Sequence, residues 1–419
     1  MIRFKIDLYQ KVSKGVEEKV IARESELVFP DVGISQIGVA IPEHYIKVAE
    51  IAKLRGLDPN FATKGLGLLE ARIPYETSIE DLIVKAVQQI DYQDVKRFYV
   101  GTESDSDMSK PLAVTALNKK LGLTVVPVQS KFACLEGVQT LLLACEYSVA
   151  HKGKPAIAIA ADRSIYHEAD PEAEITSGCA AVAMRVEMNP ELLALDYQHI
   201  GQYAEDIDDF RIPWRTAPFP EVDGPLTKPA FLKCIKWAVA DWKKENPGFG
   251  PILDKLDYFV LHVPFAKIVE WHMAMFWHHE KFGEEERLTI EDCLKNPELW
   301  DEYKKTIDET RKMPEFREFF AQKVSPGLQY NSYTGNCYTA SIFISLIAVL
   351  EQIKEDQELG MAAYGSGAGS LIVRGRAMKS GFRNNLKEQI EKKGKELILE
   401  QYQEWRERTL KEIRSTSPS

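Results

Sequence analysis

The sequence predicts an α/β fold made of two similar halves. Short apolar strands alternate with amphipathic helices along most of the chain, and the pattern of residues 96–102 recurs at residues 256–262. In both places a polar start precedes a buried aromatic strand, which ends at a residue suited to chemistry, Thr102 or His262. The alternation favours a layered α/β domain, and the recurrence indicates an internal duplication.

The first half is expected over residues 32–190, after a charged N-terminal extension of residues 1–31. Residues 77–81 have capping-box spacing, so a helix is expected to begin there. Apolar segments at residues 97–101, 155–161 and 179–186 predict strands, and the apolar run over 138–149 predicts a helix.

The second half is expected over residues 191–375. It contains the strand before His262, a helix over about 339–353 and strands at 361–364 and 370–373. The charged segment of about 280–322 reads as an exposed helical insertion. Residues 376–419 form a charged C-terminal region, with one amphipathic helix over 381–413. We interpret this helix as a surface helix packed by Leu397, Ile398, Tyr402 and Trp405 rather than as a docking site for a partner.

Composition excludes several classes of protein. Lys and Arg number 53 against 63 Asp and Glu, a net charge of −10, which argues against broad nucleic-acid binding. No apolar stretch is long enough to span a membrane, and the N-terminus lacks the features of a signal or transit peptide. Six cysteines without CxxC pairing favour a reducing compartment. We therefore expect a cytoplasmic protein that contacts neither membranes nor nucleic acid.

Cys134 is the most informative residue. It directly precedes the predicted helix over 138–149, and a helix N-terminus favours the thiolate form. Glu103 and His262 each follow a predicted strand. A Cys, a Glu and a His at such junctions indicate acyl-thioester chemistry rather than a metal site. The other cluster of metal-binding residue types, His278, His279 and Cys293, fits no zinc spacing, so no metal is expected.

Six motifs in order resemble the hydroxymethylglutaryl-CoA synthase family of the thiolase superfamily. The match covers about residues 32–375 and comprises Gly101-Thr102-Glu103-Ser104, Ala133-Cys134, the segment 220–226, the segment 262–267, Gly335-Asn336-Cys337-Tyr338-Thr339 and Tyr364-Gly365-Ser366-Gly367. The chain departs from the family at Leu135-Glu136, where small residues or Tyr are common. A carboxylate at Glu136 would oppose thiolate formation unless it points away from Cys134.

The resemblance implies a five-layer αβαβα fold and a role for each site residue. Cys134 would be the nucleophile, Glu103 the general base, with a raised pKa, that deprotonates the acetyl methyl group, and His262 the donor to the acceptor ketone. The expected substrate-binding residues are Asn336, Tyr166, Phe210, Ser366, Gly367 and Lys267.

The implied reaction condenses acetyl-CoA with acetoacetyl-CoA through an acetyl-cysteine and serves the mevalonate route to isoprenoids. Coenzyme A thioesters are substrates, no cofactor is expected, and the superfamily favours a homodimer. Three alternatives stay open. The acceptor could be carried by an acyl-carrier protein, the enzyme could be a decarboxylating ketoacyl synthase of the same fold, or the chain could be a catalytically silent scaffold. Retention of Cys134, Glu103, His262 and Asn336 together argues against the scaffold.

Overall fold

The computed structural model describes residues 31–104, 107, 109–167, 170–212, 219–283 and 288–416. Residues 1–30 of the predicted N-terminal extension and residues 284–287 of the predicted insertion lie outside the described residues. No helix in the described ranges combines the length and apolar character needed to cross a membrane.

Nine strands form one hydrogen-bonded series in the order β11-β12-β13-β8-β1-β7-β6-β4-β5. The first half contributes β1 (Val32–Ala40), β4 (Arg97–Gly101), β5 (Val128–Ser130), β6 (Ala156–Arg163) and β7 (Cys179–Met188). The second half contributes β8 (Leu193–Ile207), β11 (Tyr258–Leu261), β12 (Glu358–Gly365) and β13 (Gly367–Ala377). The predicted strands before Thr102 and His262 are thus present as β4 and β11.

The two halves join at a narrow contact between β1 and β8. Only Gly33 and Ile34 of β1 pair with this neighbour, through Ala194 and Leu193. A Cβ atom on Gly33 would lie 2.0 Å from the carbonyl oxygen of Leu193, so the close approach requires glycine.

The strand topology repeats between the halves. The order β4-β6-β7-β1 is matched by β11-β12-β13-β8. In each set the first pair is parallel and the next two are antiparallel. A helix precedes the second strand of each set: α5 (Glu136–Ala150) before β6, and α13 (Ser341–Leu350) before β12. This repetition agrees with the predicted internal duplication.

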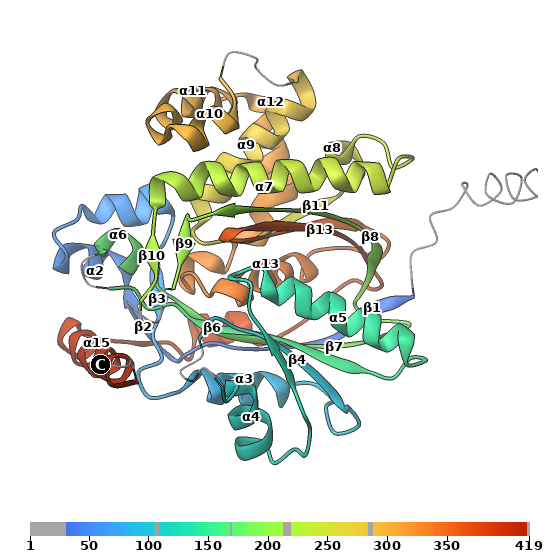
Figure 1. The fold of residues 1–419 in the computed structure, drawn as a ribbon, viewed down its shortest axis with the longest axis vertical. Helices are drawn as coiled ribbons and strands as arrows, with labels where there is room; N and C mark the ends of the chain where they lie inside the picture. Colours follow the sequence, from blue (N-terminus) through green and yellow to red (C-terminus); the bar gives the residue numbers. More distant parts are fainter. Residues whose placement is uncertain are drawn as a thin grey trace, which may run out of the picture. The chain divides into compact units, whose positions relative to one another are not determined.

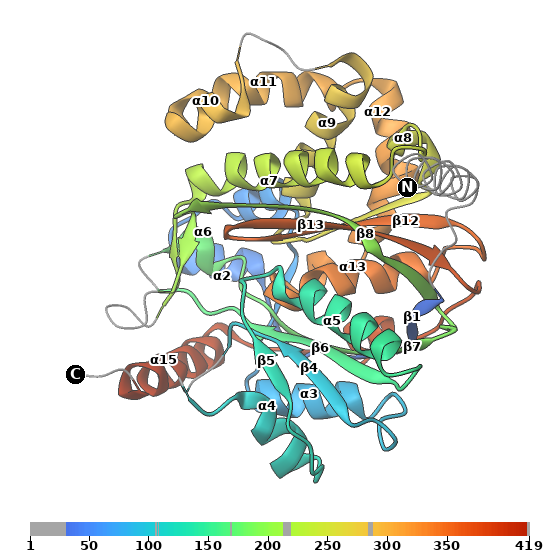
Figure 2. The same cartoon turned by 45° about the vertical axis from the view of Figure 1, so that its right-hand side comes forward.

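The elements stack in five layers, as predicted (Figures 1 and 2). The middle layer contains α5 and α13, between the two parts of the sheet. Helix α7 (Gly224–Glu245) covers the outer face of β8 and β13, while α3 (Ile79–Val87) covers the outer face of β7 and β1, near α4 (Leu112–Val114). Helix α3 begins with the predicted capping box, formed by Ser78 and Asp81.

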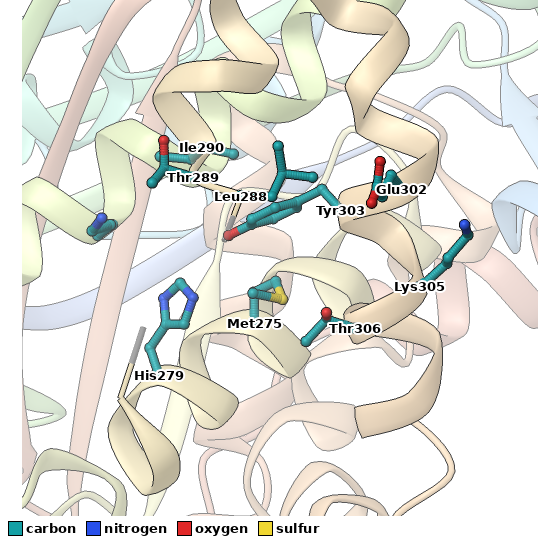
Figure 3. A pocket seen from close by; sticks show the side chains of 10 residues that line it. Met275, His279, Leu288, Thr289, Ile290, Glu302, Tyr303, Lys305 and Thr306 are labelled. Atoms are coloured by element: carbon teal, nitrogen blue, oxygen red, sulfur yellow. The ribbon is translucent and has the colours of Figure 1, made fainter. Parts of the chain in front are cut away.

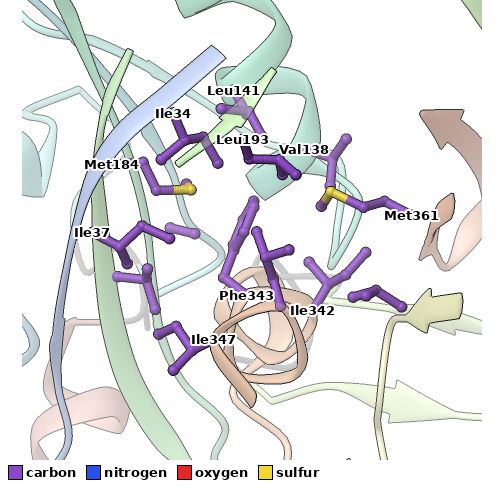
Figure 4. Close-up of a cluster of buried hydrophobic side chains, with 14 of the residues drawn as sticks. Ile34, Ile37, Val138, Leu141, Met184, Leu193, Ile342, Phe343, Ile347 and Met361 are labelled. Carbon is purple, nitrogen blue, oxygen red and sulfur yellow. The ribbon is translucent and has the colours of Figure 1, made fainter. Parts of the chain in front are cut away.

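The hydrophobic core surrounds the middle layer (Figure 4). Val138 and Leu141 of α5 and Ile342 and Phe343 of α13 are completely buried. They pack with Met361 and other side chains from both parts of the sheet. Every side chain of α13 is buried, which suits a helix that is apolar on all sides. The two halves therefore share one core.

The predicted insertion is helical but is not simply exposed. It begins at the end of α9 (Ala266–Phe282) and continues through α10 (Ile290–Lys295), α11 (Trp300–Thr310) and α12 (Pro314–Phe319). Trp300, Tyr303, Ile307 and Phe316 are buried and belong to the same apolar cluster as the inner face of α7. The charged residues that dominate this segment mark only its outer face.

The C-terminal region differs from the single helix predicted over residues 381–413. It forms α14 (Leu386–Glu391), β14 (Lys395–Glu396) and α15 (Leu399–Thr416). Strand β14 pairs with β2 (His44–Lys47), which also pairs with β3 (Glu70–Arg72). The predicted anchors Leu397, Tyr402 and Trp405 are buried, whereas Ile398 is 61% exposed. The sequence predicted one continuous helix because charged residues lie on both sides of β14, where the helix is interrupted.

The remaining elements are short. They are α2 (Val48–Leu54), α6 (Pro171–Glu174), α8 (Ile252–Lys255), β9 (Phe210–Arg211), β10 (Glu221–Val222), the π-helices Phe61–Leu66, Thr115–Lys120 and Phe320–Val324, and the 3₁₀ helices Pro297–Leu299, Ser325–Leu328, Asn331–Tyr333 and Tyr338–Ala340.

Candidate active site

Polar side chains follow the carboxyl ends of the parallel strands. Glu103 follows β4, Asp162 lies at the end of β6, which is parallel to β4, and His262 follows β11. Parallel strands end at the same edge of a sheet, so β4 and β6 bring Glu103 and Asp162 together. Cys134 lies between β5 and the first residue of α5, Glu136.

Glu103 has the environment of a general base. Its Oε1 atom is buried and has no hydrogen-bond partner among the described residues. Burial and the nearby Asp162 carboxylate raise the pKa of Glu103 to about 8, against opposing contributions from Lys131 and the Ala133 backbone. The raised pKa that we expected for this carboxyl group is therefore present.

Asp162 fixes the loop that carries Glu103. The carboxylate is fully buried, and burial raises its pKa to about 6. Its Oδ1 atom accepts hydrogen bonds from the Glu103 backbone N–H at 2.7 Å and from the hydroxyls of Thr102 and Ser104 at 3.0 and 2.7 Å. Its Oδ2 atom accepts from the Thr339 hydroxyl at 2.6 Å and from the Thr339 N–H at 3.2 Å. Asp162 thus ties the Glu103 loop to the second half.

Cys134 occupies the predicted place at a helix start, but its protonation is opposite to our expectation. Burial and the carboxylates of Asp162, Glu103 and Asp209 raise the pKa of the thiol well above its ordinary value. The positive end of α5 does not outweigh three nearby acidic groups. In the resting protein Cys134 is therefore a thiol rather than a thiolate.

Glu136, the departure from the family pattern, belongs to a different contact. Its side chain is 4% exposed and accepts a hydrogen bond from the Ser130 hydroxyl. Burial raises the pKa of Glu136. Its charge adds to the raised pKa of Glu103 and is not among the main causes of the raised pKa of Cys134.

Three aromatic rings cluster around Tyr338, and the two tyrosines among them lie near Cys134. Tyr338 makes edge contacts with Tyr166 and Phe210, with centroids 6.3 and 5.9 Å apart. Both tyrosines are buried close enough to Cys134 for its charge to contribute to their raised pKa values. The pKa of Tyr166 reaches about 12, mainly through burial, so its hydroxyl is neutral.

Asn336 is hydrogen-bonded to both tyrosines of this cluster. Its Oδ1 atom accepts from the Tyr338 N–H at 3.0 Å and from the Ser341 hydroxyl at 3.2 Å. Its side chain also bonds Tyr166. Its backbone N–H donates to the Thr176 carbonyl at 2.8 Å. Asn336, which belongs to the second half, therefore helps to hold the tyrosine rings of this cluster in place.

Ser366 and Gly367 form hydrogen bonds with the carboxylate of Asp209, a residue that the sequence analysis did not identify. The Gly367 N–H donates to Asp209 Oδ1 at 2.9 Å, the Ser366 side chain bonds the same carboxylate, and Tyr364 donates to Oδ2 at 2.7 Å. A Cβ atom on Gly365 would lie 2.6 Å from the Phe132 carbonyl oxygen. The turn that carries Ser366 and Gly367 therefore approaches the Cys134 loop closely.

His262 is buried and neutral. Its side chain is 1% exposed, and burial lowers its pKa to about 3. Its Nδ1 atom has no hydrogen-bond partner within the described part of the chain. Phe231 lies beside His262 and stacks on Tyr364, with centroids 6.1 and 4.3 Å apart. Through Tyr364 this group is connected to Asp209, one of the acids near Cys134.

Lys267 is the predicted residue least connected to this site. Its ammonium group donates to Glu270, one helical turn away, at 2.7 Å. A cavity of about 170 Å³ is likewise separate: it lies between α7, α9 and α11, near the start of α10, and is lined by residues such as Met275, Thr289 and Tyr303 (Figure 3). None of the predicted site residues lines this cavity.

Asp162, Asp209 and Tyr338 are the site residues that sequence reasoning missed. Asp162 ends an apolar strand, the same signal that identified Glu103, so it could have been found. Tyr338 lies within a quoted motif. Asp209 has no local signal, because its partners Tyr364 and Gly367 are far away in the sequence.

Models of one family match almost the whole described chain. The hydroxymethylglutaryl-coenzyme A synthase N-terminal model matches residues 29–191, and the C-terminal model matches residues 193–403. This chain belongs to the hydroxymethylglutaryl-CoA synthase family. It is therefore an acyl-transferring enzyme of the condensing class, as the resemblance implied.

Individual members of the hydroxymethylglutaryl-CoA synthase family are similar over most of the chain. The hydroxymethylglutaryl-CoA synthase of Haloferax volcanii is 28% identical over 78% of this chain and 80% of its own length. The solved structure of MvaS in complex with 3-hydroxy-3-methylglutaryl coenzyme A has a TM-score of 0.74 at 24% identity, covering 90% of this chain and 91% of that one. The HMG synthase of the curacin biosynthetic pathway in complex with apo donor-ACP has a TM-score of 0.75 at 22% identity, covering 90% and 89%. These structures confirm the predicted thiolase-type fold.

Proposed function

We propose that this chain is a hydroxymethylglutaryl-CoA synthase that condenses acetyl-CoA with acetoacetyl-CoA through an acetyl-Cys134 intermediate. The observation that carries the proposal is the buried Glu103 carboxyl group, with a pKa of about 8, beside the Cys134 thiol. A desolvated carboxylate of this kind suits the removal of a weakly acidic carbon-bound proton near neutral pH.

The first half-reaction transfers the acetyl group to sulfur. The ionised Glu103 accepts the thiol proton of Cys134, and the thiolate attacks the acetyl carbonyl of acetyl-CoA. The carbon–sulfur bond to coenzyme A breaks, and the proton passes to the departing thiolate. Glu103 is then ionised again for the next step.

The second half-reaction forms the carbon–carbon bond. Glu103 removes a methyl proton from the acetyl thioester, and the resulting carbanion attacks the ketone of acetoacetyl-CoA. His262, neutral at working pH, donates a hydrogen bond to the ketone oxygen as it gains charge, and the alkoxide then takes up the proton that Glu103 removed, which returns Glu103 to its ionised form. Tyr166, Phe210 and Tyr338 line the acetyl group, and Asn336 supports their arrangement. Water then cleaves the thioester at Cys134 and releases hydroxymethylglutaryl-CoA.

The second candidate function uses an acceptor bound to an acyl-carrier protein. The observation in its favour is that the curacin-pathway neighbour is described in complex with a carrier protein, although one for the donor group, so a protein of this fold can engage an acyl-carrier protein. Both candidates share the acetyl-Cys134 step and differ only in what carries the β-ketoacyl group. For either reaction we propose that the protein is a cytoplasmic homodimer. The first reaction would belong to the mevalonate route. We propose Lys267 as the contact for the phosphates of coenzyme A.

Mass spectrometry after mixing with acetyl-CoA tests the proposal. Cys134 should gain one acetyl group, and the Cys134→Ala variant should gain none. The acetylated protein is then offered free acetoacetyl-CoA or a carrier-bound acetoacetyl group, and product formation identifies the acceptor. A wild-type protein that never acetylates would instead be the catalytically silent scaffold.

A further inference from the structure

The segment that carries Tyr166 lies between the second half and the C-terminal helix α15. We call residues 164–167 and 170–178 the Tyr166 segment. On one side, Asn336 donates its N–H to Thr176, and the Ser164 hydroxyl donates to the Asn336 carbonyl at 2.8 Å. On the other side, Ile165 and Ile175 pack in the same apolar cluster as Tyr402 and Trp405 of α15.

A buried ion cluster connects α15 to this segment. Glu174 has no exposed surface and accepts hydrogen bonds from Arg55 at 2.6 and 3.1 Å and from the Tyr402 hydroxyl at 2.8 Å. Arg406 Nε lies 3.0 Å from Glu174 Oε1. A buried carboxylate requires such partners, because an unpaired buried charge is strongly unfavourable.

Arg406 also reaches the aromatic residue itself. Its Nη2 atom donates to the backbone carbonyl of Tyr166 at 2.7 Å, and the Arg406 side chain is 4% exposed. One guanidinium group therefore forms an ion pair with Glu174 through Nε and donates a hydrogen bond to Tyr166 through Nη2, a spacing of two charged nitrogens that lysine lacks. The side chain of Tyr166 is buried and lies near Cys134.

We propose that Arg406 of α15 is a positioning residue for the acyl pocket, which holds Tyr166 beside Cys134 through its paired contacts with Glu174 and the Tyr166 carbonyl. The inference rests on the proposed function and extends it to a C-terminal element. Arg406 lies beyond residue 403, where the match to the family model ends, so the family match does not assign it a role.

Arg406→Lys is the decisive variant. Lysine keeps a positive charge near Glu174 but has no second nitrogen to donate to the Tyr166 carbonyl at the same time, so the variant should fold and melt within a few degrees of wild type. The rate of Cys134 acetylation should fall about tenfold or more, because small displacements in a reacting site are costly, while KM for acetyl-CoA stays within about twofold. Arg406→Met should slow acetylation at least as much.

Arg408→Met provides the matched control. Arg408 lies on the same helix and donates to the Tyr75 carbonyl at an exposed site. Hydrogen exchange, followed by mass spectrometry, supplies a readout independent of activity. Amides of the Tyr166 segment should exchange faster in both Arg406 variants and at the wild-type rate in Arg408→Met.

The outcomes separate the two proposals. Wild-type acetylation and exchange in Arg406→Lys would overturn the positioning role. A wild-type protein that is never acetylated, with faster exchange in Arg406→Lys, would overturn the proposed function and leave the anchoring in place. If neither Arg406 variant folds, Tyr402→Phe removes one donor to Glu174 and keeps the ring. It should show a weaker form of the same two effects, and wild-type behaviour in both would overturn the proposal.

Discussion

At the scale of single residues, the surroundings of Glu103 and Asp162 give these two neighbouring carboxyl groups different roles. Glu103 has a pKa of about 8 and Asp162 about 6, and both are raised mainly by burial. Five hydrogen bonds to Asp162 favour its charged form, whereas Glu103 keeps one buried oxygen without a partner in the described chain. Asp162 is thus suited to hold structure, and Glu103 to exchange protons.

The raised pKa of Glu103 predicts a stability cost that depends on pH. Between about pH 4.5 and 8 the folded state binds more protons at Glu103 than the unfolded state, so its contribution to stability falls as pH rises. Glu103→Gln cannot ionise and should melt roughly 1–3 °C higher than wild type at pH 9. At pH 5 the difference should be smaller.

Thermal melts across this pH range, with Glu146→Gln on the exposed face of α5 as control, check the prediction. A difference between Glu103→Gln and wild type that shrinks as pH rises would contradict the assigned direction of the pKa.

Because His262 is neutral and is proposed to contact only the acceptor ketone, we expect its removal to slow condensation and not acetylation. His262→Ala should retain acetylation of Cys134 within a few-fold but lose about 10²-fold or more in condensation, because one donor to the developing charge is removed. Acetyl-adduct formation and product formation, measured separately, test this prediction. Equal losses in both half-reactions would assign His262 to a shared step or to folding.

At the scale of elements, α5 and α13 set the distance between the halves. Gly137 lies in the first turn of α5, where an added Cβ would lie 2.5 Å from the Thr339 carbonyl oxygen and 2.9 Å from the Phe343 ring. Helix propensity alone predicts that Gly137→Ala gains about 1 kcal/mol. The close approach reverses this sign.

Gly137→Ala should therefore lose about 1–3 kcal/mol in the free energy of unfolding and slow acetylation, because Thr339 and Cys134 both move. Chemical denaturation measures the loss. Gly224→Ala at the start of α7, where no atom lies within 4 Å of the added group, is the control and should be close to neutral. A stabilised Gly137→Ala protein would show that the helices can separate freely.

Local patterns explain which elements were predictable. Cys134, Glu103 and His262 were found because each follows an apolar strand or precedes an apolar helix. Asp209 and Arg406 act through partners more than 150 residues away, such as Tyr364 and Tyr166, which no local pattern encodes. The prediction that Cys134 is a thiolate was wrong for the same reason, since the acidic residues that raise its pKa come from three separate segments of the chain.

At the scale of the whole molecule, the free edge of the sheet predicts self-association. Strand β5 is at one end of the series; Val128, its first residue, is 36% exposed, and Val126, just before it, is 83% exposed. An edge strand flanked by exposed apolar side chains can pair with its copy in a second molecule. The double variant Val126→Lys with Val128→Lys should shift the expected dimer to monomers in light-scattering measurements.

Ile398→Lys, at an exposed apolar residue elsewhere, should leave the mass unchanged. A wild-type monomer at assay concentration would contradict the dimer, and a double variant that stays dimeric would place the interface elsewhere.

The central claim is that Glu103 removes the methyl proton after Cys134 has accepted the acetyl group. A single-turnover experiment on the Glu103→Ala variant tests it most directly. Cys134 is first acetylated by long incubation with acetyl-CoA, so the rate of the later condensation does not depend on how fast the variant is acetylated. Upon addition of acetoacetyl-CoA, the variant should keep its acetyl group on Cys134 and form product at a rate about 10²–10⁴-fold below wild type. Condensation at near the wild-type rate would contradict the account and favour a decarboxylating mechanism that needs no carboxylate base.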